Sequence, residues 1–269
     1  MTGMACRRRG GPAVRIWRRA WAAVLLVASG LAWSADATVK IGVLAFRPKD
    51  ETLARWQPTA DYLSAKIPGA HFVVNALSYT ELEQAIIARQ VDFVLTNPAH
   101  YVMMMKRSGL STLATLIVSE GGKPVDSFGG VVVVRSTRGD LQSLTDLKGK
   151  TIATPDQESF GGYVMQVFEL KRIGLAAVKD YRVLMTGMPH DAAFQAMLDG
   201  RADAAFVRTG LIESLAATGR LDARTVRVLN LQHFAGFPYL TSTRLYPEWP
   251  FSALPHVERR LAPQVAAAL

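Results

Sequence analysis

Cysteine is nearly absent from this sequence of 269 residues, in which Cys6 is the only one. A single thiol excludes an internal disulfide and a thiolate metal site, and the chain after residue 37 has no cysteine nucleophile. Histidines occur singly, at positions 71, 100, 190, 233 and 256, and the HExxH, GxSxG and GxxxxGK[ST] patterns are missing. The sequence therefore favours no catalytic class, and we expect neither a metal nor a cofactor.

Acidic residues are missing from the first thirty-five positions, which hold six arginines followed by an apolar run at 20–32. A serine and a glycine interrupt this run, which is short for a bilayer span, and the small residues Ala35 and Ala37 suit a cleavage site. We predict a signal peptide over residues 1–37, cleaved near Ala37, and a periplasmic location for the remainder. The alternative is an uncleaved anchor, with the domain still on the periplasmic side and membrane association through this segment only.

Little net charge remains without that segment. The full chain has 31 Lys and Arg against 22 Asp and Glu, so loss of the six arginines leaves 25 against 22. No basic run or zinc-ligand spacing remains either, and we expect no nucleic-acid partner.

Short β-rich runs alternate with segments of helical period from residue 39 onward, which is typical of an α/β fold with largely parallel sheets. Thr80 and Glu83 form a capping-box pattern, and Pro98 suits a first helical turn, so helices are predicted to begin there. Further helices are predicted at 160–173 and 189–198. The predicted strands lie at 39–45, 71–77, 91–97, 113–119, 128–135, 150–155, 181–187, 202–208 and 226–230.

A turn-rich stretch at 120–127 divides these runs into two sets. We predict lobe one over residues 38–127 and 231–269, and lobe two over residues 128–230. The run at 226–230 is predicted to be the return crossing, after which the chain should pack on lobe one.

Ligands of open α/β sheets bind beyond the carboxyl ends of the strands, where loops lead into helices. At one such point Ser159, Phe160 and Gly161 open a predicted helix, where a hydroxyl and free backbone N–H groups suit an oxyanion. The same residues also suit a simple helix cap, because serine is a common N-cap residue.

Two further points of this kind carry polar side chains. Thr96 and Asn97 follow the third strand, and Tyr101 lies one helical turn further on. This group can bind a ligand, or it can be a capped turn with a half-buried tyrosine. His190 opens a predicted helix, where it can donate to an anion or lie exposed.

Arg208 ends a strand that otherwise contains alanine, phenylalanine and valine. Its guanidinium can serve as a bidentate counter-charge for a carboxylate, sulfonate or phosphonate. The alternative is a structural salt bridge, for example to Glu213 or Asp203. Arg47 is a further candidate cation, although its position fits a solvated surface.

Several stretches occur in an order and spacing typical of one family, over nearly the whole chain after residue 37. They are IGVLAFRP at 41–48, YLSAKI at 62–67, VDFVLTNPAHYV at 91–102, LTDLKGKTIATPD at 144–156, ESFGGYV at 158–164, PHDAAFQAMLDGRADAAFVRTG at 189–210 and LYPEWPF at 245–251. Together they resemble the phosphate/phosphonate-binding family of periplasmic proteins, and within it the sensor region of tetrathionate-sensor-type histidine kinases.

This resemblance implies a type II periplasmic-binding (Venus-flytrap) fold, in which two lobes with mixed, mostly parallel sheets close on a ligand about a two-strand hinge. It also implies a ligand-holding role for Ser159 and His190. Relatives that bind phosphonate carry more hydroxyls in the serine loop, where this chain has Phe160 and two glycines. A sulfur oxyanion is therefore at least as suitable a ligand as a phosphonate.

The resulting hypothesis is a non-enzymatic periplasmic receptor for a small oxyanion, namely phosphonate, phosphate or a sulfur oxyanion such as tetrathionate. Its partner would be an ABC permease or a sensor histidine kinase. One alternative is an enzyme on the same fold that acts on a small acid with His190 as base. Another is a structural module that binds no ligand.

Overall fold

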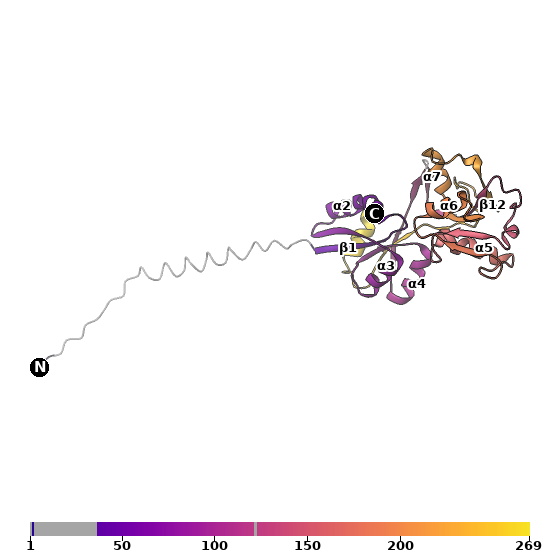
Figure 1. The fold of residues 1–269 in the computed structure, drawn as a ribbon. Helices are drawn as coiled ribbons and strands as arrows, with labels where there is room; N and C mark the ends of the chain where they lie inside the picture. The colour runs from indigo at the N-terminus through magenta and orange to yellow at the C-terminus, as the bar shows by residue number, and fades with distance from the viewer. Residues whose placement is uncertain (1, 3–36, 121–122) are drawn as a thin grey trace. The chain divides into compact units, whose positions relative to one another are not determined.

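The computed structural model describes Thr2 and residues 37–120 and 123–269 (Figure 1). The predicted signal peptide therefore lies outside the described residues, apart from Thr2 and Ala37. Residues Thr38–Leu269 form one compact unit. None of the described helices is both long enough and apolar enough to cross a bilayer.

The first sheet has five strands in the order β2-β1-β3-β14-β4. Strands β1 and β3 are parallel, with Ile41 opposite Phe93. Strand β14 is antiparallel to both of its neighbours, β3 and β4, so these two run in the same direction. The strands are β1 (Ala37–Leu44), β2 (Ala70–Leu77), β3 (Phe93–Leu95), β4 (Ser111–Thr115) and β14 (Pro250–Ala253). Helices α2 (Lys49–Lys66), α3 (Tyr79–Ile87), α4 (Pro98–Ser108) and α8 (Leu261–Ala268) accompany them.

The helix starts in this part of the chain follow from local capping. Helix α3 begins two residues earlier than predicted, because Ser78 is the N-cap and Glu81 completes the capping box. The prediction that Thr80 and Glu83 form this box is wrong. Asn97 caps α4 by accepting from the backbone N–H of His100, which leaves Pro98 in the first turn as predicted.

The second sheet has the order β10-β9-β11-β8-β12. Strands β9, β10 and β11 are mutually parallel, while β8 is antiparallel to β11 and β12. Side chains of β8 alternate between two cores, since Val131 and Val133 pack with α6 and Val132 and Val134 pack on the side of α5. The strands are β8 (Gly130–Arg135), β9 (Thr151–Thr154), β10 (Arg182–Met185), β11 (Ala204–Arg208) and β12 (Val226–Leu229). The helices are α5 (Met165–Arg172), α6 (His190–Leu198) and α7 (Leu211–Ala217), with short helical turns at Leu144–Leu147, Phe160–Val164 and Ala223–Thr225.

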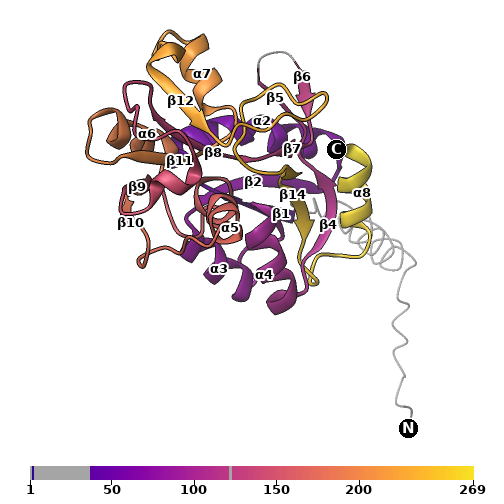
Figure 2. The same ribbon diagram turned by 90° about the vertical axis from the view of Figure 1, so that its right-hand side faces the viewer.

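Strand direction in both sheets agrees with the predicted α/β class with mixed, mostly parallel sheets. Figure 1 shows the helices in two groups, with α2, α3 and α4 near β1 and with α5, α6 and α7 near β12. In the second view α8 and β4 lie side by side, on the opposite side from β9 and β10 (Figure 2).

Two segments connect the sheets, and each contributes one short strand to a separate two-stranded ladder. Strands β7 (Ser127–Phe128) and β13 (Tyr246–Pro247) pair antiparallel, with Phe128 opposite Tyr246. This ladder is the two-strand connection expected of the fold. The lobe boundaries predicted at residues 127/128 and 230/231 fall in these connecting segments and stay a prediction.

Three predictions about the connecting segments are wrong. The predicted strand 113–119 is divided between β4 and a hairpin of β5 (Val118–Glu120) with β6 (Lys123–Val125), and this hairpin occupies much of the predicted turn. The run at 226–230 is an edge strand of the second sheet, and the crossing follows it. After the crossing the chain does not pack on the first sheet alone, because the Ser242 N–H donates to the Gly130 carbonyl and the Ser242 hydroxyl accepts from Val132.

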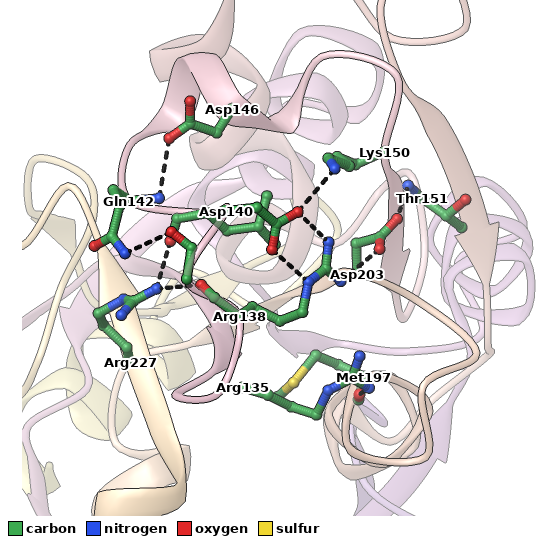
Figure 3. Close-up of polar contacts among 12 residues, drawn as sticks. Arg135, Arg138, Asp140, Gln142, Asp146, Lys150, Thr151, Met197, Asp203 and Arg227 are labelled. Carbon is green, nitrogen blue, oxygen red and sulfur yellow. Dashed lines mark hydrogen bonds and ion pairs between the residues drawn. The ribbon is translucent and has the colours of Figure 1, made fainter.

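An ion network fixes the start of β11 to the loop that follows β8 (Figure 3). The Arg138 guanidinium donates to Asp140 over 2.7 Å and to Asp203 over 2.6 Å. Lys150 Nζ lies 3.0 Å from Asp140, and the Thr151 N–H donates to Asp203 over 2.8 Å. These hydrogen bonds from Arg138 and Lys150 lower the pKa of Asp140 well below its usual value. Asp203 is thus engaged at the opposite end of β11 from Arg208.

Candidate ligand site

Two adjoining cavities lie where loops of both sheets meet, and they share Phe46, His190, Arg208 and Trp249 as lining residues. We call the first, of about 20 Å³, the serine compartment; it is also lined by Tyr79, Asn97, Phe128, Ser159, Phe160, Gly161 and Met188. The second, of about 40 Å³, is the indole compartment; its other lining residues are Arg47, Arg55, Trp56, Leu116, Val118, Asp191, Thr209, Gly210 and Leu211. The two volumes each have room for only one to a few water molecules, which suits a small ligand.

His190 has its tautomer fixed by its neighbours at the start of α6. Its Nδ1 accepts from the backbone N–H of Arg208 over 3.1 Å, so the ring hydrogen belongs on Nε2, which lies 3.2 Å from Ser159 Oγ. Burial, and secondarily the charges of Arg208 and Arg47, lowers the pKa of His190 to about 3. His190 is therefore neutral and buried, contrary to the alternative of an exposed residue.

The same geometry determines what Ser159 can offer. Its oxygen accepts from His190 Nε2–H, so the hydroxyl hydrogen is available to an acceptor in the serine compartment. The unprotonated nitrogen of His190 is already used by the backbone of Arg208. This arrangement supplies a hydrogen-bond donor, and it leaves His190 without a free lone pair for a general base.

The glycines after Ser159 allow close approach of the helix start. A Cβ atom on Gly162 would lie 2.6 Å from His190 Cε1 and 2.8 Å from Ser159 Oγ. A Cβ atom on Gly161 would lie 3.0 Å from the Phe128 ring. The predicted helix 160–173 begins as a π-helix over Phe160–Val164 and continues as α5. Its first hydrogen bond joins the Val164 N–H to the Ser159 carbonyl, so the preceding amides lack an intrahelical acceptor.

Phe160 connects the serine compartment with the crossing ladder. Its ring makes edge contacts with Phe128 of β7, at 5.9 Å between centroids, and with Tyr246 of β13, at 4.9 Å. A side chain that lines the site therefore also contacts both strands of the connection between the sheets.

Arg208 lines both compartments and forms an ion pair with Glu248, whose side chain is 1% exposed. Its guanidinium also lies over the Phe128 ring, 4.4 Å from the centroid. The salt-bridge partners considered from the sequence are wrong: Glu213 accepts from the Leu240 N–H, and Asp203 belongs to the Arg138 network. The partner comes from the crossing segment and could not be placed from sequence distance.

Of the three residues predicted to bind a ligand after β3, one lines a cavity and two do not. Asn97 lines the serine compartment and donates from Nδ2 to the Tyr79 hydroxyl over 2.7 Å. Thr96 is buried with its hydroxyl 2.8 Å from His100 Nδ1, and neither Thr96 nor Tyr101 lines either compartment. Six of the eight predicted residues thus meet in one cavity, and their ligand-binding role stays a prediction.

Tyr79 was missed in the sequence. Its hydroxyl donates to the Glu158 carbonyl over 3.0 Å while it accepts from Asn97, so it bridges loops of the two sheets. Burial and the nearby charges of Asp156 and Glu158 raise its pKa, which keeps the hydroxyl protonated. The only available signal was its position directly after a helix cap.

The indole compartment was also missed, although two of its aromatic residues, Phe46 and Trp249, lie in the stretches AFRP and LYPEWPF. Phe46 and Trp249 pack edge to face with centroids 5.2 Å apart. Arg47 lies 3.4 Å from Asp191, which also pairs with Arg220 at 3.3 Å. Within residues 37–120 and 123–269, no cluster of three or more His, Cys, Asp or Glu side chains is arranged to hold a metal ion.

Two mixed α/β sheets, joined by two crossing segments and with two small adjoining cavities where their loops meet, define a periplasmic binding protein of type II. Residues 41–269 match the family described as the periplasmic substrate-binding protein of phosphonate ABC transporters. The chain belongs to this phosphonate-binding family, which confirms the resemblance seen in the sequence.

Comparison with individual proteins gives the same class. The tetrathionate sensor histidine kinase of Salmonella typhimurium is 36% identical over 248 residues, or 92% of this chain, and the chain spans 41% of that protein's length. A binding protein component of an ABC phosphonate transporter from Pseudomonas aeruginosa has a TM-score of 0.68 at 16% identity, covering 86% of this chain and 73% of that one. A Prochlorococcus marinus protein in complex with methylphosphonate has a TM-score of 0.65 at 15% identity, covering 86% and 83%.

The family fixes the general character of the protein. Its members are substrate-binding proteins and sensor domains, so the chain is a binding protein and not an enzyme. The family and the sensor relative also imply a location outside the cytoplasm.

Proposed function

We propose that this chain is the ligand-binding part of a periplasmic sensing system for a small oxyanion, and that tetrathionate is the first ligand to test. The observation that carries the proposal is the hydrogen-bonded chain Arg208 N–H, His190, Ser159 within the serine compartment. The 36% identity to a tetrathionate sensor kinase supports the choice of ligand.

The serine compartment has the donors that an oxyanion needs. His190 orients Ser159 so that its hydroxyl hydrogen points away from the ring, and the amides that precede Val164 lie next to it in the chain. Arg208 adds guanidinium N–H groups beyond the one that contacts Glu248. Donors held in place before binding and removed from water interact strongly with a charged ligand.

Hydroxyls are few in this site, which argues against phosphonate as the main ligand. Directly after Ser159 the chain has Phe160, Gly161 and Gly162, where a more polar loop would suit a phosphonate, whose charge is concentrated on one head group. Aromatic and aliphatic walls suit a more polarisable anion such as a sulfur oxyanion.

Closure would carry the signal through the crossing segments. Tyr79 and Glu158 connect the two sides of the cavity, and Phe160 contacts both β7 and β13. A ligand that favours these contacts shifts the protein toward the closed form. We propose a sensor histidine kinase as the partner, with an ABC permease as the second candidate because the family includes transporter components.

The test is a thermal-unfolding screen of residues 38–269 against tetrathionate, thiosulfate, sulfate, phosphate, methylphosphonate and small carboxylates. A ligand at one hundred times its dissociation constant stabilises the folded state by about 2.7 kcal/mol, and calorimetry then gives the affinity. We expect a selective rise in Tm with tetrathionate. A rise with methylphosphonate alone would replace the sulfur oxyanion by a phosphonate, and no rise with any anion would overturn the proposal.

A further inference from the structure

Residues 38–269 contain two tryptophans, Trp56 in α2 and Trp249 before β14, and both line the indole compartment. The Nε1–H group of each is buried and has no hydrogen-bond partner among the described residues. Trp249 is 5% exposed as a whole residue and lines the serine compartment as well. Two tryptophans, each with a buried and unpaired donor, therefore line the same cavity.

Such donors are uncommon, because a buried N–H group without an acceptor loses its hydrogen bond to water. Most buried indoles find a partner. Tyr181 also has a buried, unpaired hydroxyl, but it lies in the core under the second sheet and lines neither compartment. The two indoles differ from it because they adjoin a space in which an acceptor can be bound.

The surroundings of the indoles suit an anionic group on an apolar body. Arg47 and Arg55 bring positive charge to this compartment, while Leu116, Val118 and Leu211 supply apolar walls. Asp191 is the acidic lining residue, and it is paired with Arg47 and Arg220.

The two compartments share Phe46, His190, Arg208 and Trp249, so a single ligand can extend through both. One end of such a ligand would meet Ser159 and the other would meet the indoles. A one-headed anion at Ser159 would leave the indole donors without an acceptor.

We infer that the indole compartment is a second subsite, in which the N–H groups of Trp56 and Trp249 donate to the far end of an elongated anion with acceptor groups at both ends. These two tryptophans then select two-headed anions over one-headed ones. The inference rests on the proposed function, since it assigns the second half of the same site.

The first experiment follows the two indole N–H signals of ¹⁵N-labelled residues 38–269 by NMR. Tetrathionate and 1,3-propanedisulfonate serve as two-headed probes, and sulfate and methanesulfonate as one-headed probes. Both indole N–H signals are expected to shift with the two-headed probes. The Trp56 signal is expected to stay in place with the one-headed probes, because Trp56 does not line the serine compartment. Binding of tetrathionate in calorimetry without movement of either indole signal would overturn the subsite and leave the proposed function intact.

The second experiment uses Trp56→Phe and Trp249→Phe, with Tyr181→Phe as the matched control that removes an unpaired polar group away from the cavity. Each tryptophan variant should weaken binding of the two-headed probes about ten-fold or more. Trp56→Phe, which alters no lining residue of the serine compartment, should change one-headed binding less than two-fold, and the control should change neither. An equal loss for both probe classes in Trp56→Phe would overturn the selective role. Failure of all four anions to bind the unaltered protein would overturn the inference, and with it the choice of a sulfur oxyanion as the ligand in the proposed function.

Discussion

The backbone N–H of Arg208 donates to His190 Nδ1 over 3.1 Å, which joins the end of β11 to the start of α6. This bond can form only when Nδ1 is unprotonated, so it determines both the tautomer of His190 and the direction in which Ser159 donates.

The pH dependence of stability follows from this bond. Burial, and secondarily the charges of Arg208 and Arg47, lowers the pKa of His190 to about 3; burial and Arg107 lower that of His100 to about 4. Between the folded-state pKa of each histidine and its unfolded pKa of about 6.5, the unfolded chain binds more protons than the folded one. The stability contributed by the two neutral histidines is therefore fully present above pH 6.5 and decreases as the pH falls below that value. We expect the free energy of unfolding, measured by urea titration at each pH, to fall by about 1 kcal/mol per pH unit for each histidine.

His190→Gln tests the assignment, because glutamine can still accept from the Arg208 N–H but does not titrate. The loss of stability between pH 6 and 4 should become shallower in this variant. An unchanged slope would mean that His190 is protonated in the folded protein.

Arg208→Met is expected to destabilise the protein by about 1–3 kcal/mol, because it removes one ion-pair partner of the buried Glu248 carboxylate. Adding Glu248→Gln should restore much of this stability, as measured by urea unfolding. The double variant should still bind tetrathionate poorly, since the cation is gone. Equal stability of the single variant and the unaltered protein would show that the ion pair does not hold the fold.

Ser159→Ala should weaken anion binding by about 1–3 kcal/mol, which calorimetry can measure, because a donor to a charged ligand is lost. The hydroxyl also accepts from His190, so His190 Nε2–H then lacks its partner and Tm should fall slightly. An unchanged affinity would remove Ser159 from the site and leave it a simple helix-start residue.

Gly162→Ala should be destabilising by about 1–3 kcal/mol, because the new methyl group would overlap His190 and Ser159. Gly139→Ala is the matched control, since a Cβ atom there meets nothing within 4 Å. Thermal unfolding of both variants gives the comparison. Similar Tm values for the two variants would show that the backbone at the helix start moves to accommodate the methyl group at little cost in stability.

The alternation of β-rich runs and helical segments was sufficient to predict the α/β class, since each run is long enough to bury a strand. The order in which strands join the sheets was not predictable. β14 inserts between β3 and β4 from more than a hundred residues away. The run at 113–119 divides between two sheets because it is interrupted by two residues, 116 and 117, that belong to neither strand.

The candidate site was likewise predictable only where a residue's position in a single strand or helix indicates its role. Ser159, His190 and Arg208, which line the serine compartment, could be singled out because each lies at a strand end or a helix start, which sequence patterns indicate. Glu248, Tyr79 and Trp56 were not found, because their roles depend on contacts between distant parts of the chain. Thr96 was predicted to bind a ligand, but its buried hydroxyl is hydrogen-bonded to His100 Nδ1.

The ion pair of Arg208 with Glu248 has one more consequence for a ligand that binds at this arginine. Such an anion meets a carboxylate that is already there, and that carboxylate is attached to the crossing segment between β13 and β14. The protein therefore carries its own tethered competitor, present at a high effective concentration that does not change with the surroundings. We therefore expect an anion that makes several simultaneous contacts to compete with this carboxylate more effectively than a singly held anion such as chloride.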